Sequence, residues 1–418
     1  MSQLSRRQLL AGSALAWPAA YAAAGVQLTV TAYPNVDQII RAVLPRWESQ
    51  HPGVTVRLVS RQYADHHTAM TTALSTSGHL PDLVALETTY MGGFALGGGL
   101  LDLSQQPFNA DRLESEFTGF AFSLARNREG RQVAIPADIG PGTLLYRHDL
   151  LAKAGVPEAS LTDSWASYVA AGREIKKATG AYLISHARTL KDIMVRCSVP
   201  ADGGQYFDAQ NRPRVTEPAF VQAFELARKV RRDGLDAQAV NWTPDWAEGL
   251  KRGRLATELS GAWMAGQMAN WVCPNTKDLW RVAHLPEQSF AFYGGTYYAL
   301  PRRAHPMRRE LAWSLLQALT RDRHVQLQAF KQEDAFPALR AAQDDPFFAE
   351  PLPFLNGQRA RLLWREAAQR IPALRMHRQH KFADEVTNSE LDNVLEFNKP
   401  IEQALADAQR VLEVRAAR

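Results

Sequence analysis

Residues LTVTA (28–32), VTVRLV (54–59) and DLVAL (82–86) form three short runs of β-branched and apolar side chains near the start of the chain. Between the first two runs, apolar residues recur at every third or fourth position from 36 to 47, which is the spacing of an amphipathic helix. A polar helical stretch separates the second run from the third. Strands that alternate with helices in this way predict an α/β fold with a mainly parallel sheet flanked by helices.

The loops that follow these strands are expected to share one edge of the sheet, because crossovers between parallel strands are right-handed. Open α/β sheets bind ligands at that edge, so the loops at 33–35 and 87–90 are candidate binding loops. The alternation continues without an internal repeat or a long linker, which favours two domains joined by short crossings. Further helices are expected at 164–179, 217–232, 308–319 and 400–414, and further strands at 143–146, 182–185, 255–259 and 296–300.

The composition is that of a globular protein: 46% of the 418 residues are hydrophobic and 22% are charged. The 48 Lys and Arg against 43 Asp and Glu leave a formal charge of +5, and two of these charges are Arg6 and Arg7. So weak and dispersed a charge argues against nucleic acid as a partner.

Residues 1–24 have the parts of an export signal: a basic start, a short apolar run and small residues before Gly25. Arg6 and Arg7 followed by two leucines resemble the twin-arginine address. The apolar run is shorter than the roughly 20 residues that span a bilayer, and no cysteine is near the cleavage point to carry a lipid. We expect a mature chain in the periplasm that begins near Gly25.

Common catalytic motifs are missing from the sequence, which contains no HExxH, GxSxG, SxxK or GxxxxGK pattern. The glycines at 92–99 lack the GxGxxG arrangement and are expected to serve helix packing and turns. The histidine pairs His66-His67 and His377/His380 have no acidic or thiol residue at ligand spacing, so we expect them to be solvated and expect neither a metal nor a cofactor.

Two residue pairs leave alternatives open. Cys197 and Cys273, the two cysteines of the chain, could form a disulfide or remain buried thiols, because their spacing does not determine their separation. Glu87 and Asp138 each follow a predicted strand and could face one cleft. Since glycosidase carboxylates have no fixed sequence spacing, catalysis stays open for this pair beside a role in ligand or hinge contacts.

The unusual feature of this sequence is its aromatic residues. It contains ten tryptophans and eleven tyrosines. Flat rings cover the apolar face of a sugar while carboxylates, amides and Arg bind its hydroxyls. Any single tryptophan is more often a residue of the core. Together they predict a carbohydrate cleft, from rings beside predicted strand ends: Tyr33, Tyr63, Tyr90, Trp242, Trp246, Trp263, Trp271, Tyr293 and Tyr297.

A set of short segments, none specific alone, occurs in one order along the chain: GHLPDLV (78–84), GLLDL (99–103), IPAD (135–138), LLYRHDLLAKAGVP (144–157), ADGG (201–204), LKRGRLA (250–256), GAW (261–263), GG (294–295) and ALP (299–301). In this order the set resembles the extracellular solute-binding proteins of bacterial ABC importers, in the group with maltose-type sugar binders. The chain departs from the family where Tyr146-Arg147 replaces Tyr-Asn and Ser164-Trp165 replaces Thr-Trp.

This resemblance implies a two-lobed periplasmic-binding-protein fold that closes by hinge bending around a ligand. The lobes would comprise residues 25–138 with 286–320, and residues 139–285 with 321–418. Three chain crossings would join them, near Ile139, Leu285 and Thr320. The implied partners are a carbohydrate and the permease subunits of an ABC transporter, and the protein would be a monomer.

The resemblance also implies positions for ligand contacts. Trp263 matches the aromatic residue that stacks on a sugar, Gly295 matches a backbone position at the cleft, and Asp138 lies beside the first crossing. The remaining expected contacts are Glu87, Thr88, Thr89 and Tyr90 in the loop after the third strand, and Tyr33, His186, Trp242 and Arg340, chosen for their places in loops.

Two other functions remain open from the sequence. One is a secreted glycosidase or lyase that uses Glu87 and Asp138. The other is a binder of polyamines or ferric ion on the same fold. Iron would need a tyrosine pair, and the adjacent Tyr297 and Tyr298 point to opposite faces of a strand. The particular sugar, its chain length and the cognate permease do not follow from the sequence.

Overall fold

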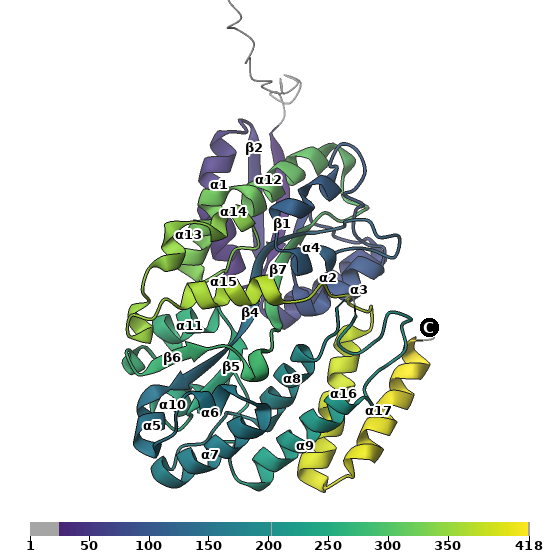
Figure 1. Ribbon diagram of the computed structural model, residues 1–418. Helices are drawn as coiled ribbons and strands as arrows, with labels where there is room; N and C mark the ends of the chain where they lie inside the picture. Colours follow the sequence, from purple (N-terminus) through teal and green to yellow (C-terminus); the bar gives the residue numbers. More distant parts are fainter. Residues whose placement is uncertain (1–24, 202, 417–418) are drawn as a thin grey trace, which may run out of the picture.

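The computed structural model describes residues 25–201 and 203–416, so the expected export signal and Asp202 lie outside the described residues. Two lobes lie one above the other, with helices on both sides of the strands (Figure 1). None of the described helices is long and apolar enough to cross a membrane.

One 7-stranded sheet has the order β2-β1-β3-β7-β4-β5, with β6 paired to β4. β1 pairs in parallel with β2 and β3, whereas the four other pairings are antiparallel. The α/β class is confirmed, but the expectation of mainly parallel strands is wrong, because β4 and β7 pass between the lobes in opposite directions. The strands are β1 (Val26–Ala32), β2 (Val54–Ser60), β3 (Leu83–Glu87), β4 (Ile135–Arg147), β5 (Thr257–Gly261), β6 (Trp280–Ala283) and β7 (Phe292–Ala299).

Helices make up most of the remaining described chain, and those predicted at 164–179, 217–232, 308–319 and 400–414 are confirmed to within a few residues. The helices are α1 (Val36–Ser49), α2 (Tyr63–Thr76), α3 (Thr88–Leu96), α4 (Gly119–Ser123), α5 (His148–Ala154), α6 (Ala159–Thr162), α7 (Trp165–Thr179), α8 (Ala187–Cys197), α9 (Pro218–Arg232), α10 (Pro244–Lys251), α11 (Met264–Gln267), α12 (Arg309–Arg321), α13 (Arg323–Glu333), α14 (Arg340–Gln343), α15 (Ala360–Arg370), α16 (His380–Phe397) and α17 (Ile401–Ala416).

The long strand β4 makes the first crossing. It pairs with β7 from Ile135 to Pro141 and with β5 from Gly142 onward, so its pairing partner changes close to Ile139. The chain returns between the end of β6 at Ala283 and the start of β7, and the crossings near Ile139 and Leu285 stay predictions.

The third crossing is predicted near Thr320, and its position stays a prediction. Beyond that residue, α13 packs with α12 against α1, because apolar side chains such as Val325 face the side of α1 that carries Val43. The chain then passes along α15 and reaches α16 through residues 371–379 (Figure 1). The limits of the two lobes stay a prediction, and this packing favours placing α13 with the first lobe.

Buried apolar residues form two clusters. The larger one surrounds β1, β3 and β7 and extends under α12 and α15, and the smaller one lies among α7, α8, α9, α16 and α17. Residues 182–185, expected as a strand, form only isolated bridges from Tyr182 to Leu255 and from Ile184 to Asp236. Cys197 and Cys273 are both free thiols.

Candidate functional site

Glu87 ends β3 and caps α3, which places its carboxylate where the first lobe faces the second. Its Oε2 accepts hydrogen bonds from Tyr63 Oη and from the backbone N–H of Thr89, both at 2.8 Å. Such a cap satisfies an orphan donor of the first helical turn. Burial raises the pKa of Glu87, and these hydrogen bonds offset only part of that shift. Glu87 is therefore a buried carboxyl group held in a defined orientation.

Aromatic rings surround this carboxyl group. The His67 ring lies 4.2 Å from that of Tyr90, nearly parallel to it, and 4.7 Å from that of Tyr63. The Tyr33 ring lies 5.6 Å from Tyr63 in an edge-on arrangement. Tyr63 remains 41% exposed, so this group presents an aromatic edge to solvent beside Glu87.

The expectation that the histidines are solvated is wrong. His66, His67 and His380 are buried, and His377 is half-buried with its ring stacked on Phe207. His67 Nδ1 lies 2.7 Å from the carbonyl oxygen of Tyr63, and His67 Nε2 accepts the N–H of Glu87 at 3.0 Å. The two ring nitrogens thus tie α2 to the end of β3. Among the described residues, no group of His, Cys, Asp or Glu is arranged to hold a metal ion.

His67 predicts a pH dependence of stability. Burial lowers its pKa to about 4 in the folded chain, against about 6.5 when unfolded, so the unfolded chain binds more protons between these values. The His67 contribution is complete above pH 6.5 and is lost as the pH falls toward 4. When the pH falls from 7 to 5, the free energy of unfolding should decrease by about 2 kcal/mol more in the parent than in His67→Gln. Urea unfolding of both proteins at the two pH values measures this difference.

The exposed His305 provides the control for this experiment. His305→Gln should leave the difference between the two pH values as it is in the parent. Buried carboxyl groups with raised pKa, such as Asp138, act in the opposite direction, so only the comparison between variants isolates His67. An unchanged pH dependence in His67→Gln would contradict the assignment.

Two glycines near the start of β7 lie close to side chains of both lobes. Gly295 has a φ of 140°, and its carbonyl oxygen accepts the Thr88 hydroxyl at 2.9 Å. A Cβ atom on Gly294 would lie 3.5 Å from Trp263 Nε1 and 3.6 Å from Glu87 Oε1. The carboxylate of the first lobe and the indole of the second thus approach the same glycine.

Asp138 lies on β4 beside these glycines. Burial raises its pKa to about 6, a hydrogen bond with Thr296 lowers it, and the charge of Glu87 raises it further. The hydroxyls of Thr296 and Tyr33 are 2.9 Å apart, so Tyr33 belongs to the same network. Four predicted contacts, namely Tyr33, Glu87, Asp138 and Gly295, are therefore neighbours in the structure.

Trp263 is half-buried beside the short strand β5. Its Nε1–H donates to the carbonyl oxygen of Tyr293 at 2.9 Å, and a Cβ atom on Gly261 would lie only 2.4 Å from the same nitrogen. Glycine at that position thus leaves room for the indole nitrogen. The hydrogen bond sets the orientation of the ring.

Trp242 and Trp271 extend this aromatic surface. The Trp242 ring lies 5.8 Å from Trp263 and 6.0 Å from Trp271, stacked on both, and Trp242 and Trp271 are 52% and 56% exposed. Large exposed rings in series are uncommon on a soluble protein and mark binding surfaces. We call Trp242, Trp263 and Trp271 the tryptophan surface.

Glu258 supports the loop that carries Trp242. Its carboxylate accepts Asn241 Nδ2 at 3.0 Å and Trp246 Nε1 at 3.1 Å, and Trp246 packs beneath Trp242. Burial raises the pKa of Glu258 to about 7, while the two hydrogen bonds lower it. The sequence analysis did not identify this positioning residue, because an acid within a buried strand has no local signal.

Arg196 is a second residue that the sequence analysis missed. Its guanidinium lies 5.0 Å from the Tyr293 ring and 5.4 Å from the Phe292 ring, within range of cation–π attraction. Its Nε is buried and has no hydrogen-bond partner among the described residues. A buried donor without an acceptor is costly, so Arg196 can serve a ligand that supplies oxygen atoms.

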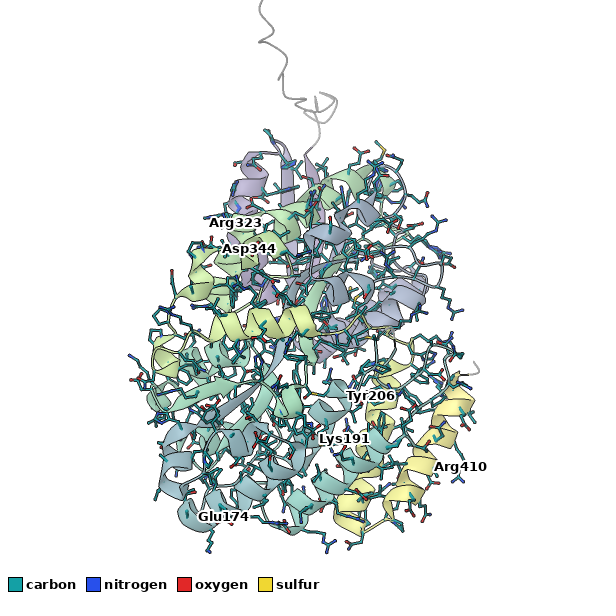
Figure 2. The ribbon with its side chains drawn as sticks, viewed as in Figure 1. Glu174, Lys191, Tyr206, Arg323, Asp344 and Arg410 are labelled. Atoms are coloured by element: carbon teal, nitrogen blue, oxygen red, sulfur yellow. The ribbon has the colours of Figure 1, made fainter. Side chains whose placement is uncertain are left out.

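A buried charge network continues from Arg196 along α8. The fully buried Lys191 forms an ion pair with Asp192, and Tyr206 Oη donates to Asp384 at 2.9 Å. Lys191 and Tyr206 are labelled in Figure 2. Burial raises the pKa of Asp384, but Lys191 and Arg196 outweigh that effect and the net shift is downward. These groups join α8 to α16 behind the site.

Of the remaining predicted contacts, two lie next to Glu87 and two lie apart from it. Thr89 and Tyr90 lie in the first turn of α3 next to Glu87. His186 caps α8, accepting the N–H of Arg188 at 3.0 Å, and its Nε2 lies 3.4 Å from Arg231. Arg340 is exposed at the start of α14. Neither His186 nor Arg340 contacts the other predicted residues, so the structure does not bring these two into the group.

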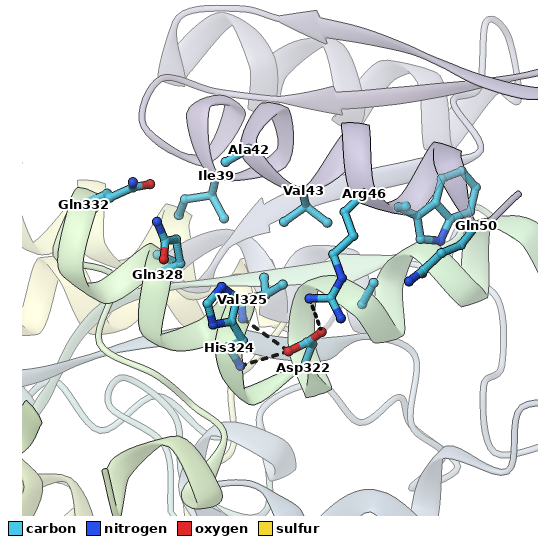
Figure 3. A pocket seen from close by; sticks show the side chains of 13 residues that line it. Ile39, Ala42, Val43, Arg46, Gln50, Asp322, His324, Val325, Gln328 and Gln332 are labelled. Carbon is cyan, nitrogen blue, oxygen red and sulfur yellow. Dashed lines mark hydrogen bonds and ion pairs between the residues drawn. The ribbon is translucent and has the colours of Figure 1, made fainter. Parts of the chain in front are cut away.

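A separate cavity of about 260 Å³ lies on the outer side of the first lobe, between α1 and α13 (Figure 3). An ion pair of 3.3 Å between Arg46 and Asp322 crosses it, and Asp322 also accepts the N–H groups of His324 and Val325. None of the predicted ligand contacts lines this cavity.

Comparisons with known proteins identify the family of the chain. Residues 33–326 match the family model of the bacterial extracellular solute-binding proteins. The chain is 26% identical over 148 residues to the arabinooligosaccharide-binding protein of Halalkalibacterium halodurans, a match that spans 35% of this chain and only 32% of that protein.

Solved structures share the whole fold. An extracellular solute-binding protein of family 1 superposes with a TM-score of 0.81 at 23% identity, covering 94% of this chain and all of the other. A binding protein from B. animalis subsp. lactis in complex with β-1,6-galactobiose has a TM-score of 0.75 at 20% identity, covering 94% and 97%. At these identities the likeness shows the two-lobed fold.

Proposed function

Because the chain belongs to the bacterial extracellular solute-binding proteins, we propose that it captures a carbohydrate between its lobes and delivers it to the permease of an ABC importer. The observation that carries this proposal is the approach of Glu87 and Trp263 to the same glycine, with the tryptophan surface continuing from it. A saccharide needs both an apolar plane and directed acceptors, and this arrangement places them on facing lobes.

Each side of the site has a distinct role in this proposal. The tryptophan surface stacks against sugar rings and, with rings in series, suits an oligosaccharide. Glu87 and Asp138 accept hydrogen bonds from hydroxyls on the opposite side, and Arg196 donates to ligand oxygens beside Tyr293. The similar proteins named above bind an arabinooligosaccharide and a galactobiose according to their descriptions, which supports an oligosaccharide of neutral sugars.

We expect the lobes to close around a saccharide that a binding screen identifies. A saccharide that contacts both lobes favours the closed arrangement, since only contacts made to both lobes distinguish it from the open one. Neutral oligosaccharides, polyols and polyamines should be screened by thermal shift, where a ligand at 100 times its Kd adds about 2.7 kcal/mol. Small-angle scattering with a ligand from this screen should then show a smaller radius of gyration.

Three outcomes would count against the proposal. Stabilisation by polyamines alone would favour the alternative ligand class. A ligand recovered in altered form after incubation would favour a glycosidase or lyase that uses Glu87 and Asp138. An unchanged radius of gyration at saturation would contradict closure.

The cellular setting follows from the same proposal. A protein that serves an importer must meet its ligand outside the cytoplasmic membrane, and the expected twin-arginine signal would deliver it folded to the periplasm. We propose that it acts there as a monomer and returns the ligand unchanged. Iron binding is disfavoured, because Tyr297 and Tyr298 are both buried and Tyr297 donates to the carbonyl oxygen of Ala121 at 2.7 Å.

A further inference from the structure

A cavity of about 1000 Å³ lies at the edge of the lobe interface, away from the tryptophan surface. Three parts of the chain line it: residues 123–130 of the first lobe, residues 207–211 of the second and the crossing segment 373–378. Leu96 at the end of α3 and Ala416 at the end of α17 also line it. A molecule in this cavity would touch both lobes and the segment that connects them.

The crossing segment is anchored on both sides. A Cβ atom on Gly92 of α3 would lie 2.3 Å from the carbonyl oxygen of His377, so only glycine allows this approach. The N–H of Arg375 donates to the carbonyl oxygen of Gly203 at 2.8 Å, and Leu374 bridges to Gly203 in parallel. The side chains of this segment therefore project from backbone that packing has positioned.

Positive charge predominates around the cavity. Arg126, Arg128, Arg375 and Arg378 line it, against Glu129 and Asp208. Arg126 is paired with Glu114 at 2.8 Å, and Asp208 with Arg212 at 2.8 Å. This leaves three arginines and Glu129, none of which forms an ion pair with another described residue.

Two of these arginines act on His377 in the cavity wall. Its pKa is lowered to about 4, first by burial and then by the charges of Arg378 and Arg128. These two arginines come from the crossing segment and from the first lobe. Both therefore act on one point of the cavity wall.

We propose that this cavity binds a small multivalent oxyanion of the phosphate class, held by Arg128, Arg375 and Arg378. The planar guanidinium group matches phosphate oxygens with two parallel hydrogen bonds, and three such groups from two separate segments, all lining one cavity, suit an ion with several acceptors. The volume leaves room for a phosphorylated compound larger than the inorganic ion. Because the arginines belong to different parts of the molecule, the anion favours the lobe arrangement seen in this structure.

The test uses inorganic phosphate and pyrophosphate with the mature chain in the absence of any saccharide. Isothermal titration at low salt should show binding of pyrophosphate, tighter than that of phosphate. A thermal shift should also appear that sodium chloride of equal ionic strength does not reproduce. Arg375→Gln combined with Arg378→Gln should weaken binding at least tenfold.

Two further variants keep the test decisive. Arg128→Gln lies in an exposed loop and should fold as the parent does while binding pyrophosphate more weakly. Arg232→Gln, an exposed residue on α9 outside the cavity, should bind as the parent does. Equal binding by Arg128→Gln and the parent, or a shift that chloride reproduces, would overturn the proposal. Because no sugar is present, these results are independent of the carbohydrate screen.

Discussion

Trp263→Ala is expected to weaken saccharide binding about 30-fold, equivalent to about 2 kcal/mol, while the chain stays folded. The indole is half-buried, its Nε1–H donates to the carbonyl oxygen of Tyr293, and the Trp242 ring is stacked on it at 5.8 Å. A truncated aromatic residue at the centre of a binding surface removes contact area that no neighbour replaces. Titration with a saccharide from the screen, together with a melting curve without ligand, measures both quantities.

Trp313 provides the matched control for this experiment. It is 9% exposed and packs against Phe108 in the first lobe, away from the tryptophan surface. Trp313→Ala should lower stability by about 3 kcal/mol or more, as for buried tryptophans generally, and leave affinity unchanged. Trp271→Ala, at the far end of the surface, should show a smaller loss of affinity than Trp263→Ala.

One pattern of results would assign Trp263 to the core instead. A Trp263→Ala protein that unfolds as early as Trp313→Ala yet binds with parental affinity would contradict the stacking role. Its effect on stability should be the smaller of the two, because Trp263 is half-buried whereas Trp313 is buried.

Gly295→Ala is expected to destabilise the chain by about 3–5 kcal/mol. The backbone φ of 140° is one that residues with a side chain rarely adopt, which alone costs roughly 1–3 kcal/mol. The added Cβ would also lie 2.6 Å from the carbonyl oxygen of Asp138 and 3.1 Å from Thr88 Oγ1. Relieving this contact requires β4 and β7 to separate at the crossing.

Gly130→Ala separates the two contributions to this cost. Gly130 has a φ of 75° but no atom within 4 Å of the position of a Cβ, so only backbone strain applies. We expect a loss of about 1 kcal/mol for Gly130→Ala. Denaturant unfolding of both variants measures the difference, and equal midpoints would show that the close approach at Gly295 does not limit stability.

Part of the site could be predicted from the sequence because it depends on local pattern. An acid at the end of an apolar run, as in Glu87 after β3, predicts a polar group at the edge of a sheet. The same reasoning does not decide the roles of His186 and Arg340, because a place in a loop does not reveal which way the loop faces. The expectation of a solvated His67 is wrong because its surroundings include Tyr90 and Glu87, which come later in the chain.

The sequence alone determined the elements and the class of fold. Helical periodicity and β-branched runs depend on residues within about ten positions of each other, and they correctly placed β1, β2, β3 and the helices α7, α9, α12 and α17. The ordered segments also determined the family, because they report many structural constraints at once. Neither kind of information measures the distance between residues far apart in the chain.

Only the tertiary structure decided which of these residues meet. Glu87, Trp263 and Gly294 come from three separated stretches, and their approach depends on how β4 and β7 pair as they cross between the lobes. The antiparallel register at this crossing, the burial of the histidines and the position of Arg196 are consequences of packing. Packing energy depends on the shapes of all neighbouring side chains together, so no local pattern contains it.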